Sequence, residues 1–147
     1  MTLRIYNSVN IDLAFIKDQL YEITKHILSD HNVNSAINLK LVDDAEMIEL
    51  NLRFRGKNKT TNVLAFSSDS EEMKASDELG DIAINYSYLT KEAGASMKTI
   101  EAHFLHLLSH GILHLLGYDH TKESDAINME KKEIRYLELF GIKNPYT

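Results

Sequence analysis

The chain has 147 residues, of which 44% are hydrophobic, so we expect a single folded domain spanning residues 1–147 rather than a disordered chain. Its formal net charge of −6 argues against nucleic-acid binding over the whole surface, so such a function would need a local basic patch. The chain has no cysteine, which excludes disulfides and cysteine-ligated metal sites. We find no signal-peptide pattern and no apolar stretch of membrane-spanning length, and therefore expect a cytoplasmic protein without membrane partners.

The first part of the chain alternates strand and helix patterns. Residues Leu3–Tyr6 could form a short strand, and apolar residues spaced by three and four predict a helix from Asp12 to about Leu28. Alternating apolar and polar residues predict a half-buried strand at Ala36–Val42. A second helix is expected from Asp43 or Asp44 to about Arg53.

The second part is expected to contain two strands, an acidic surface loop and two helices. These elements are a strand at Asn62–Phe66, a loop at Ser67–Leu79, a strand at Asp81–Tyr86, a helix from Thr99 to Leu116, and a helix from Glu123 to Phe140 that Gly141 ends. The pattern predicts an α+β (layered α/β) fold with one mixed sheet of about four strands, packed with about five helices. The candidate metal site would lie at the end of a buried helix.

Five of the seven histidines lie between residues 103 and 120. His110 and His114 are four residues apart, so on a helix their rings would lie on one face and could hold one ion. Gly117 can adopt a left-handed conformation, end the helix and reverse the chain. The spacing His-x3-His-x2-Gly-x2-His therefore predicts that His120 completes a three-histidine metal site.

Three neutral imidazoles suit Zn²⁺, one ion per chain, although other divalent transition metals accept the same ligands. Structural zinc sites are usually closed by four protein ligands, often cysteines. Three histidines leave a fourth position open, where a metal can activate water. The pattern therefore favours a working site over a purely structural one.

The residue after the first histidine separates this chain from zinc peptidases of similar spacing. Those enzymes have glutamate there as a general base, and this chain has Gly111. Either the metal-bound hydroxide acts without such a base or another group, such as Asp119, assists. Of the two roles open to Asp119, we favour orienting a histidine over acting as a base.

The remaining histidines have simpler interpretations. His103 and His106 are expected to be hydrogen-bonded residues of an apolar helix. His106 lies one turn before His110 and could support it. His26 and His31 have no partner in sequence and are expected on the surface.

Residues 53–59 carry four positive charges and no acid, in an otherwise acidic chain. One interpretation is a solvated loop after a helix. The other is a phosphate-binding loop, since an arginine can make two parallel hydrogen bonds to a phosphate and stabilise charge that grows on it. Gly56 would permit a tight turn beside such a ligand. The sequence alone does not place this loop next to the histidines.

The run His110–His120, HGILHLLGYDH, resembles the H-G-x-L-H-L-x-G-Y-D-H signature of the YbeY family of bacterial endoribonucleases at every fixed position. Residues 51–66, NLRFRGKNKTTNVLAF, are similar to that family's segment in which an aromatic residue precedes R-G-K-D-K-P-T and V-L-S-F follows. Residues 80–82 and 101–103 also match the family's sequence pattern. This chain departs from that pattern at Asn58, Thr60, Ala65 and Ser67, none of which is a candidate metal ligand.

This resemblance implies a metal-dependent endoribonuclease that cuts single-stranded RNA rather than DNA. It further implies a role in 16S rRNA 3′-end maturation and in ribosome quality control, with the ribosomal small subunit as partner. Residue by residue, His110, His114 and His120 take the three metal-ligand positions. Arg55 takes the position of the family's essential arginine and is the candidate catalytic residue.

Our mechanistic hypothesis places RNA in a groove with Arg55 on one wall, together with Lys57 and Lys59 as further substrate-binding residues. The metal would activate water, or polarise the phosphate for attack by the ribose 2′-hydroxyl, while Arg55 stabilises the developing charge. Two alternatives stay open: a metallopeptidase-like hydrolase, and a non-catalytic, ribosome-associated module in which metal serves only stability.

Overall fold

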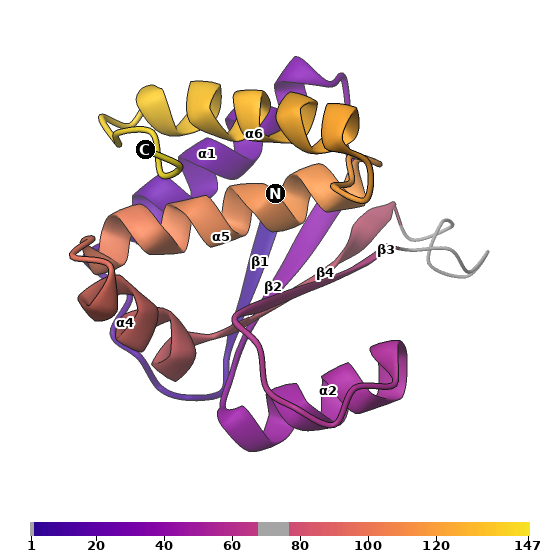
Figure 1. Ribbon diagram of the computed structural model, residues 1–147, viewed down its shortest axis with the longest axis vertical. Coiled ribbons are helices and arrows are strands. Elements are labelled where there is room, and N and C mark those ends of the chain that lie inside the picture. The colour runs from indigo at the N-terminus through magenta and orange to yellow at the C-terminus, as the bar shows by residue number, and fades with distance from the viewer. Residues whose placement is uncertain (1, 68–76) are drawn as a thin grey trace.

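A computed structural model describes residues 2–67 and 77–147 of the chain (Figure 1). One mixed sheet has the spatial order β1-β2-β4-β3. Strands β1, β2 and β4 are parallel, whereas β3 pairs antiparallel with β4 and forms an edge of the sheet. The strands are β1 (Leu3–Asn7), β2 (Ala36–Val42), β3 (Val63–Ser67) and β4 (Glu78–Asn85).

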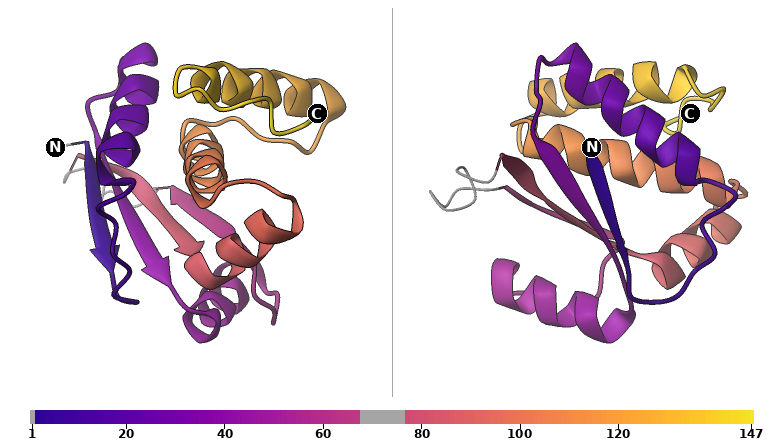
Figure 2. Two further views of the ribbon diagram at one scale, coloured as in Figure 1. Left: turned by 90° about the vertical axis from the view of Figure 1, so that its left-hand side faces the viewer. Right: turned by 180° about the vertical axis from the view of Figure 1, so that it is seen from behind.

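Five helices pack around this sheet in the described part of the chain: α1 (Lys17–Asp30), α2 (Asp44–Arg55), α4 (Tyr86–Ala95), α5 (Ile100–Leu115) and α6 (Glu123–Glu138). Helix α5 lies at the centre of the layer on one face, where it contacts β3, β4, α1, α4 and α6. Helix α2 covers the opposite face (Figures 1 and 2). The predicted fold class is confirmed. Within the described ranges no helix combines the length and apolar character needed to cross a membrane.

The sheet separates two hydrophobic clusters. Because successive side chains of a strand point to opposite faces, Ile82 and Ile84 join the large cluster under α1, α5 and α6, while Ala83 faces α2. The small cluster beneath α2, which we call the α2 cluster, consists of Val42, Met47, Leu64 and Ala83. Strand β3 is divided in the same way: Val63 and Ala65 pack toward α5, and Leu64 and Phe66 toward α2.

Two predicted helix starts are confirmed by their caps. Asp43 accepts a hydrogen bond from the Glu46 amide at 2.8 Å and begins α2, and Thr99 accepts one from the Ala102 amide at 3.0 Å and begins α5. Each cap satisfies an amide that has no partner within the helix.

Other boundaries differ from the prediction. The first helix begins at Lys17 rather than Asp12, because the Asp12 carboxylate accepts from the nearby Ala14 amide in a turn that precedes the helix. Helix α4 follows β4 directly, where we expected no helix, and Asn85 caps it by accepting from the Tyr88 amide. The acidic loop expected at 67–79 lies mostly outside the described residues, with Ser67 in β3 and 78–79 in β4.

Gly80 lies at a close contact between β4, β3 and α5. A methyl group on Gly80 would overlap the carbonyl oxygen of Phe66 and lie 2.7 Å from Leu115 Cδ2. We expect Gly80→Ala to cost about 1–3 kcal/mol, because backbone must move to accept it. Thermal unfolding should then show a Tm lower by roughly 2–10 °C.

Gly94→Ala is the matched control, since a methyl group there would meet nothing within 4 Å and Gly94 lies in helix α4. It should leave the Tm unchanged or raise it slightly, because alanine favours helix over glycine. Equal Tm values for the two variants would contradict the close packing at Gly80.

Candidate metal centre

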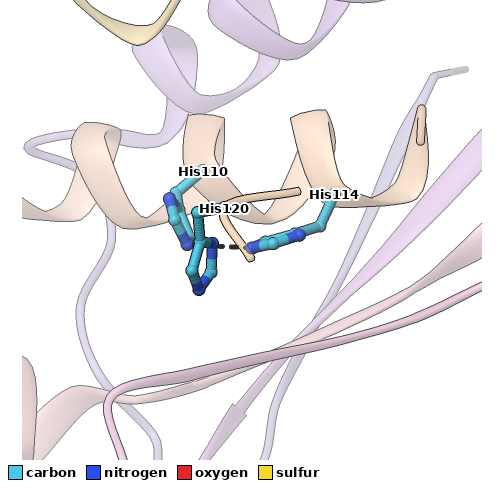
Figure 3. A group of neighbouring side chains, drawn as sticks. All are labelled: His110, His114 and His120. Carbon is cyan, nitrogen blue, oxygen red and sulfur yellow. Dashed lines mark hydrogen bonds between the residues drawn. The ribbon is translucent and has the colours of Figure 1, made fainter. Parts of the chain in front are cut away.

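Three histidine rings converge at the C-terminal end of α5 (Figure 3). His110 and His114 come from successive turns of the helix, and their ring centroids are 4.6 Å apart. The His120 ring lies 5.5 Å from that of His110 and 4.9 Å from that of His114. One potential ligand atom from each residue lies within 4.8 Å of the others. Two rings are half-buried, whereas His120 is exposed and leaves the group open on one side.

The chain reversal that returns His120 to the helix is fixed at Gly117 and Tyr118. Gly117 has φ +101°, the left-handed conformation expected for it. The Tyr118 amide donates to the Leu113 carbonyl at 3.0 Å. Its hydroxyl donates to His31 Nε2 at 3.0 Å, while His31 Nδ1 donates to the Ile27 carbonyl. The turn is therefore tied both to α5 and to α1.

The Nδ1 atoms of the two helical ligand candidates face hydrogen-bond acceptors. His110 Nδ1 donates to Glu133 Oε1 at 2.7 Å, and His114 Nδ1 donates to the Tyr118 carbonyl at 3.0 Å. In its neutral form each ring carries one proton, and these contacts place that proton on Nδ1 and leave a lone pair on Nε2. These two Nε2 atoms face each other at 3.1 Å.

Glu133, which the sequence analysis did not select, is the buried carboxylate behind His110. Its side chain is fully buried on α6 and also accepts from the Tyr146 hydroxyl, at 2.5 Å to Oε2. His106 Nε2 lies 3.2 Å from that hydroxyl and 3.5 Å from Glu133 Oε1. Burial opposes the charged carboxylate, but hydrogen bonds from His106, His110 and Tyr146 lower the pKa of Glu133 to about 2. An ionised Glu133 thus fixes the orientation of His110.

The electrostatics of the group keep His114 neutral. Burial, followed by the neighbouring His110 and His120, lowers the pKa of His114 to about 4. The positive charge of Arg55, which lines the same cavity as this ring, lowers it further. A neutral histidine is the form that binds metal.

The donor set fits a divalent transition metal. Two inward lone pairs on His110 and His114, each backed by a hydrogen bond on the opposite nitrogen, are the arrangement typical of histidine ligands. His120 supplies a third imidazole from the open side. In the described part of the chain, no other group of histidine and acidic side chains has this geometry.

The helix packs too closely on the sheet for a peptidase-type glutamate. A methyl group on Gly111 would lie 3.0 Å from two carbon atoms of Ile82 on β4. A longer side chain there would have to displace Ile82 or move α5 away from β4. The close approach of α5 to β4 therefore explains the glycine and counts against the metallopeptidase alternative.

The basic segment lies beside the histidines. A cavity of about 260 Å³ is lined by all three histidines together with Arg55, Lys57 and Lys59. Asn51, also on its wall, is buried and donates to the Lys59 carbonyl at 2.8 Å. Gly56 ends α2 with φ +68°, and the Lys57 amide donates to the Asn51 carbonyl. The segment is thus a fixed turn against the cavity and not merely a solvated loop.

Some expectations for individual polar residues were wrong. The carboxylate of Asp119 accepts from the amide and hydroxyl of Thr121, so it stabilises its own turn, and Glu133 orients a histidine instead. His31 is half-buried rather than on the surface, since it bonds to Tyr118. The expectation for His103 is confirmed: it is buried, with Nε2 3.0 Å from Glu92 Oε1.

Comparison with known proteins identifies close similarities over nearly the whole chain. The profile of the family described as endoribonuclease YbeY matches residues 4–141. A protein named endoribonuclease YbeY from Coxiella burnetii is 42% identical over 134 residues, covering 91% of this chain and 88% of that protein. One from Acinetobacter baylyi is 42% identical over 138 residues, covering 90% and 86%. The solution structure of TM1509 from Thermotoga maritima aligns with TM-score 0.68 and 30% identity, covering 93% and 87%.

The contact between Glu133 and His110 generates a prediction for metal affinity. Glu133→Gln keeps the shape of the side chain but removes the charge that holds the Nδ1 proton of His110. We expect the Kd for Zn²⁺ to rise by about 10- to 100-fold, measured by competition with a chromogenic chelator.

Glu138→Gln on the same helix is the control, because Glu138 is exposed and should leave the Kd unchanged. Circular dichroism of both variants checks that the fold is retained. If Glu133→Gln bound Zn²⁺ as tightly as the control, orientation of His110 by Glu133 would be refuted.

Proposed function

The chain belongs to the YbeY family of endoribonucleases, and we propose that it cleaves single-stranded RNA at the cavity between the three histidines and the basic turn. The single observation that supports this site most strongly is the shared cavity. In it, three converging imidazoles from residues 110–120 lie beside Arg55, Lys57 and Lys59, which belong to a distant part of the sequence.

The charge of this cavity suits a polyanion. Its described lining residues include no aspartate or glutamate, although the chain as a whole has a net charge of −6. A phosphodiester entering it would meet imidazoles, amide side chains and three cations. Local charge of this kind attracts nucleic acid even where the global charge does not.

His110, His114 and His120 would hold one Zn²⁺ or another divalent transition metal per chain. When bound, such an ion supplies Lewis acidity, activating water or polarising a phosphate oxygen. Glu133 and the Tyr118 carbonyl keep the two helical imidazoles in the required tautomer. The exposed position of His120 leaves room for substrate on the open side.

Arg55 would bind the scissile phosphate and stabilise the negative charge that develops on it. Its guanidinium can make two parallel hydrogen bonds to phosphate oxygens. Lys57 and Lys59 would contact neighbouring phosphates of the same strand, because they line the same wall. Asn51 assists indirectly by fixing the turn that carries them.

The substrate we propose is single-stranded ribosomal RNA of the small subunit, with action in 16S rRNA 3′-end maturation and ribosome quality control. The family membership supports this assignment. Such a substrate would be met in the cytoplasm, on the ribosomal small subunit or its precursors.

Removing the Arg55 side chain should separate cleavage from metal binding. We expect Arg55→Ala to reduce kcat for a single-stranded RNA oligomer by about 10²- to 10³-fold, because charge in the transition state loses its partner. Metal content by mass spectrometry should stay near one ion per chain. Lys131→Ala, which removes an exposed cation on α6, is the control and should cleave normally. Full cleavage by metal-loaded Arg55→Ala would exclude the proposed role.

Removing the metal distinguishes the enzyme from a non-catalytic binding module. Chelation should abolish cleavage, lower the Tm and leave RNA binding to the basic turn largely intact, and Zn²⁺ should restore activity. A binding module in which the metal serves only stability would show the same fall in Tm on chelation, but it would cleave no RNA at any metal concentration.

A further inference from the structure

An aromatic pair lies beside the basic turn. Phe54, in the last turn of α2, is 54% exposed, and its ring centroid is 4.5 Å from that of Phe66 on β3, with the planes tilted by 41°. A single exposed aromatic residue is common on proteins and needs no explanation. Here two rings are held together at the sheet edge, so the pair presents a combined aromatic surface.

The pair is supported from below and flanked by a cation. Phe66 is half-buried and packs on the α2 cluster, which fixes its ring. The Arg53 guanidinium carbon lies 5.4 Å from the Phe54 ring centroid. We call Arg53, Phe54 and Phe66 the aromatic platform. Flat groups with a cation alongside are what proteins use to stack unpaired bases.

The platform adjoins the histidine cavity through Arg55. A second cavity, of about 610 Å³, is lined by Phe54, Arg55, Ala65, Phe66 and Ser67, and it shares Arg55 and Ala65 with the first. Its described lining also contains no acidic residue. An RNA strand whose phosphate contacts Arg55 from the side of the histidines would therefore place an adjacent nucleotide at the aromatic platform.

We propose that the aromatic platform binds, by stacking, the nucleobase next to the cleaved phosphodiester. This inference rests on the proposed function and assigns a subsite to that same site. Stacking accepts any base, so it provides affinity without strict sequence recognition. It also requires a base released from a duplex, which gives a physical basis for a preference for single strands.

The direct test measures binding and cleavage of a 12-nucleotide single-stranded RNA. We expect Phe54→Ala to raise both the Kd from fluorescence anisotropy and the KM of cleavage by about 5- to 100-fold, with kcat much less affected. The anisotropy titration is done at low temperature, and a gel checks that the RNA is intact. Phe54→Tyr keeps an aromatic ring and should bind like the unchanged protein, whereas Phe54→Leu should behave like alanine.

Leu52→Ala is the matched control, because Leu52 is 50% exposed on the same helix and lines neither cavity. It should leave Kd and KM unchanged. Circular dichroism and Tm of every variant exclude a general loss of folding.

A set of RNAs with one abasic ribonucleotide identifies the stacked base. The abasic site should weaken binding to the unchanged protein at one position beside the cleavage site, and should have little further effect on Phe54→Ala. Equal abasic penalties in both proteins, or an unchanged Kd for Phe54→Ala, would overturn the platform. A dimer that Phe54→Ala converts to monomer without any change in RNA binding would also overturn it, since the patch would then be a self-contact.

The two proposals fail separately. If the unchanged protein cleaves RNA and Phe54→Ala does so with the same KM, the platform is wrong and the proposed function stands. If the unchanged protein cleaves no RNA, the proposed function fails, and the abasic binding series still decides whether the platform stacks a base.

Discussion

A neutral imidazole has one lone pair to offer a cation, so a three-histidine centre depends on what holds the other nitrogen of each ring. Here the hydrogen bond from His110 Nδ1 to the buried Glu133 and that from His114 Nδ1 to the Tyr118 carbonyl direct both Nε2 atoms inward. Each hydrogen bond connects α5 to a different part of the fold. Glu133 lies on α6, and Tyr118 is bonded to His31, which follows α1. The centre therefore depends on the packing of α1 and α6 around α5.

What the sequence could predict was local. The i, i+4 spacing of His110 and His114 and the left-handed Gly117 follow from helix geometry, so the triad was predictable without tertiary information. Glu133 was not found because an acidic residue was not expected on the buried face of α6. The buried residues of this helix are Met129, Glu133, Tyr136 and Leu137, whereas Ile127 is 47% exposed. A single carboxylate at helical spacing among apolar residues was the available signal.

The position of the basic turn could not be predicted because it is a tertiary property. Four cations near residue 55 are visible in the sequence, but their place beside the histidines depends on the strand order, in which β3 lies at the sheet edge between α2 and α5. As an edge strand, β3 contributes residues to both cavities. Ala65 lines the histidine cavity, and Phe66, on the opposite face of the strand, belongs to the aromatic pair. Gly111 shows how close α5 must approach β4 for this arrangement.

X-ray absorption at the zinc edge, on protein loaded with one equivalent of Zn²⁺, tests the central claim most directly. The account predicts three imidazole nitrogens and one oxygen donor at about 2.0–2.2 Å, and one imidazole fewer after His120→Ala. A spectrum with fewer than three imidazoles, or one that His120→Ala leaves unchanged, would contradict it.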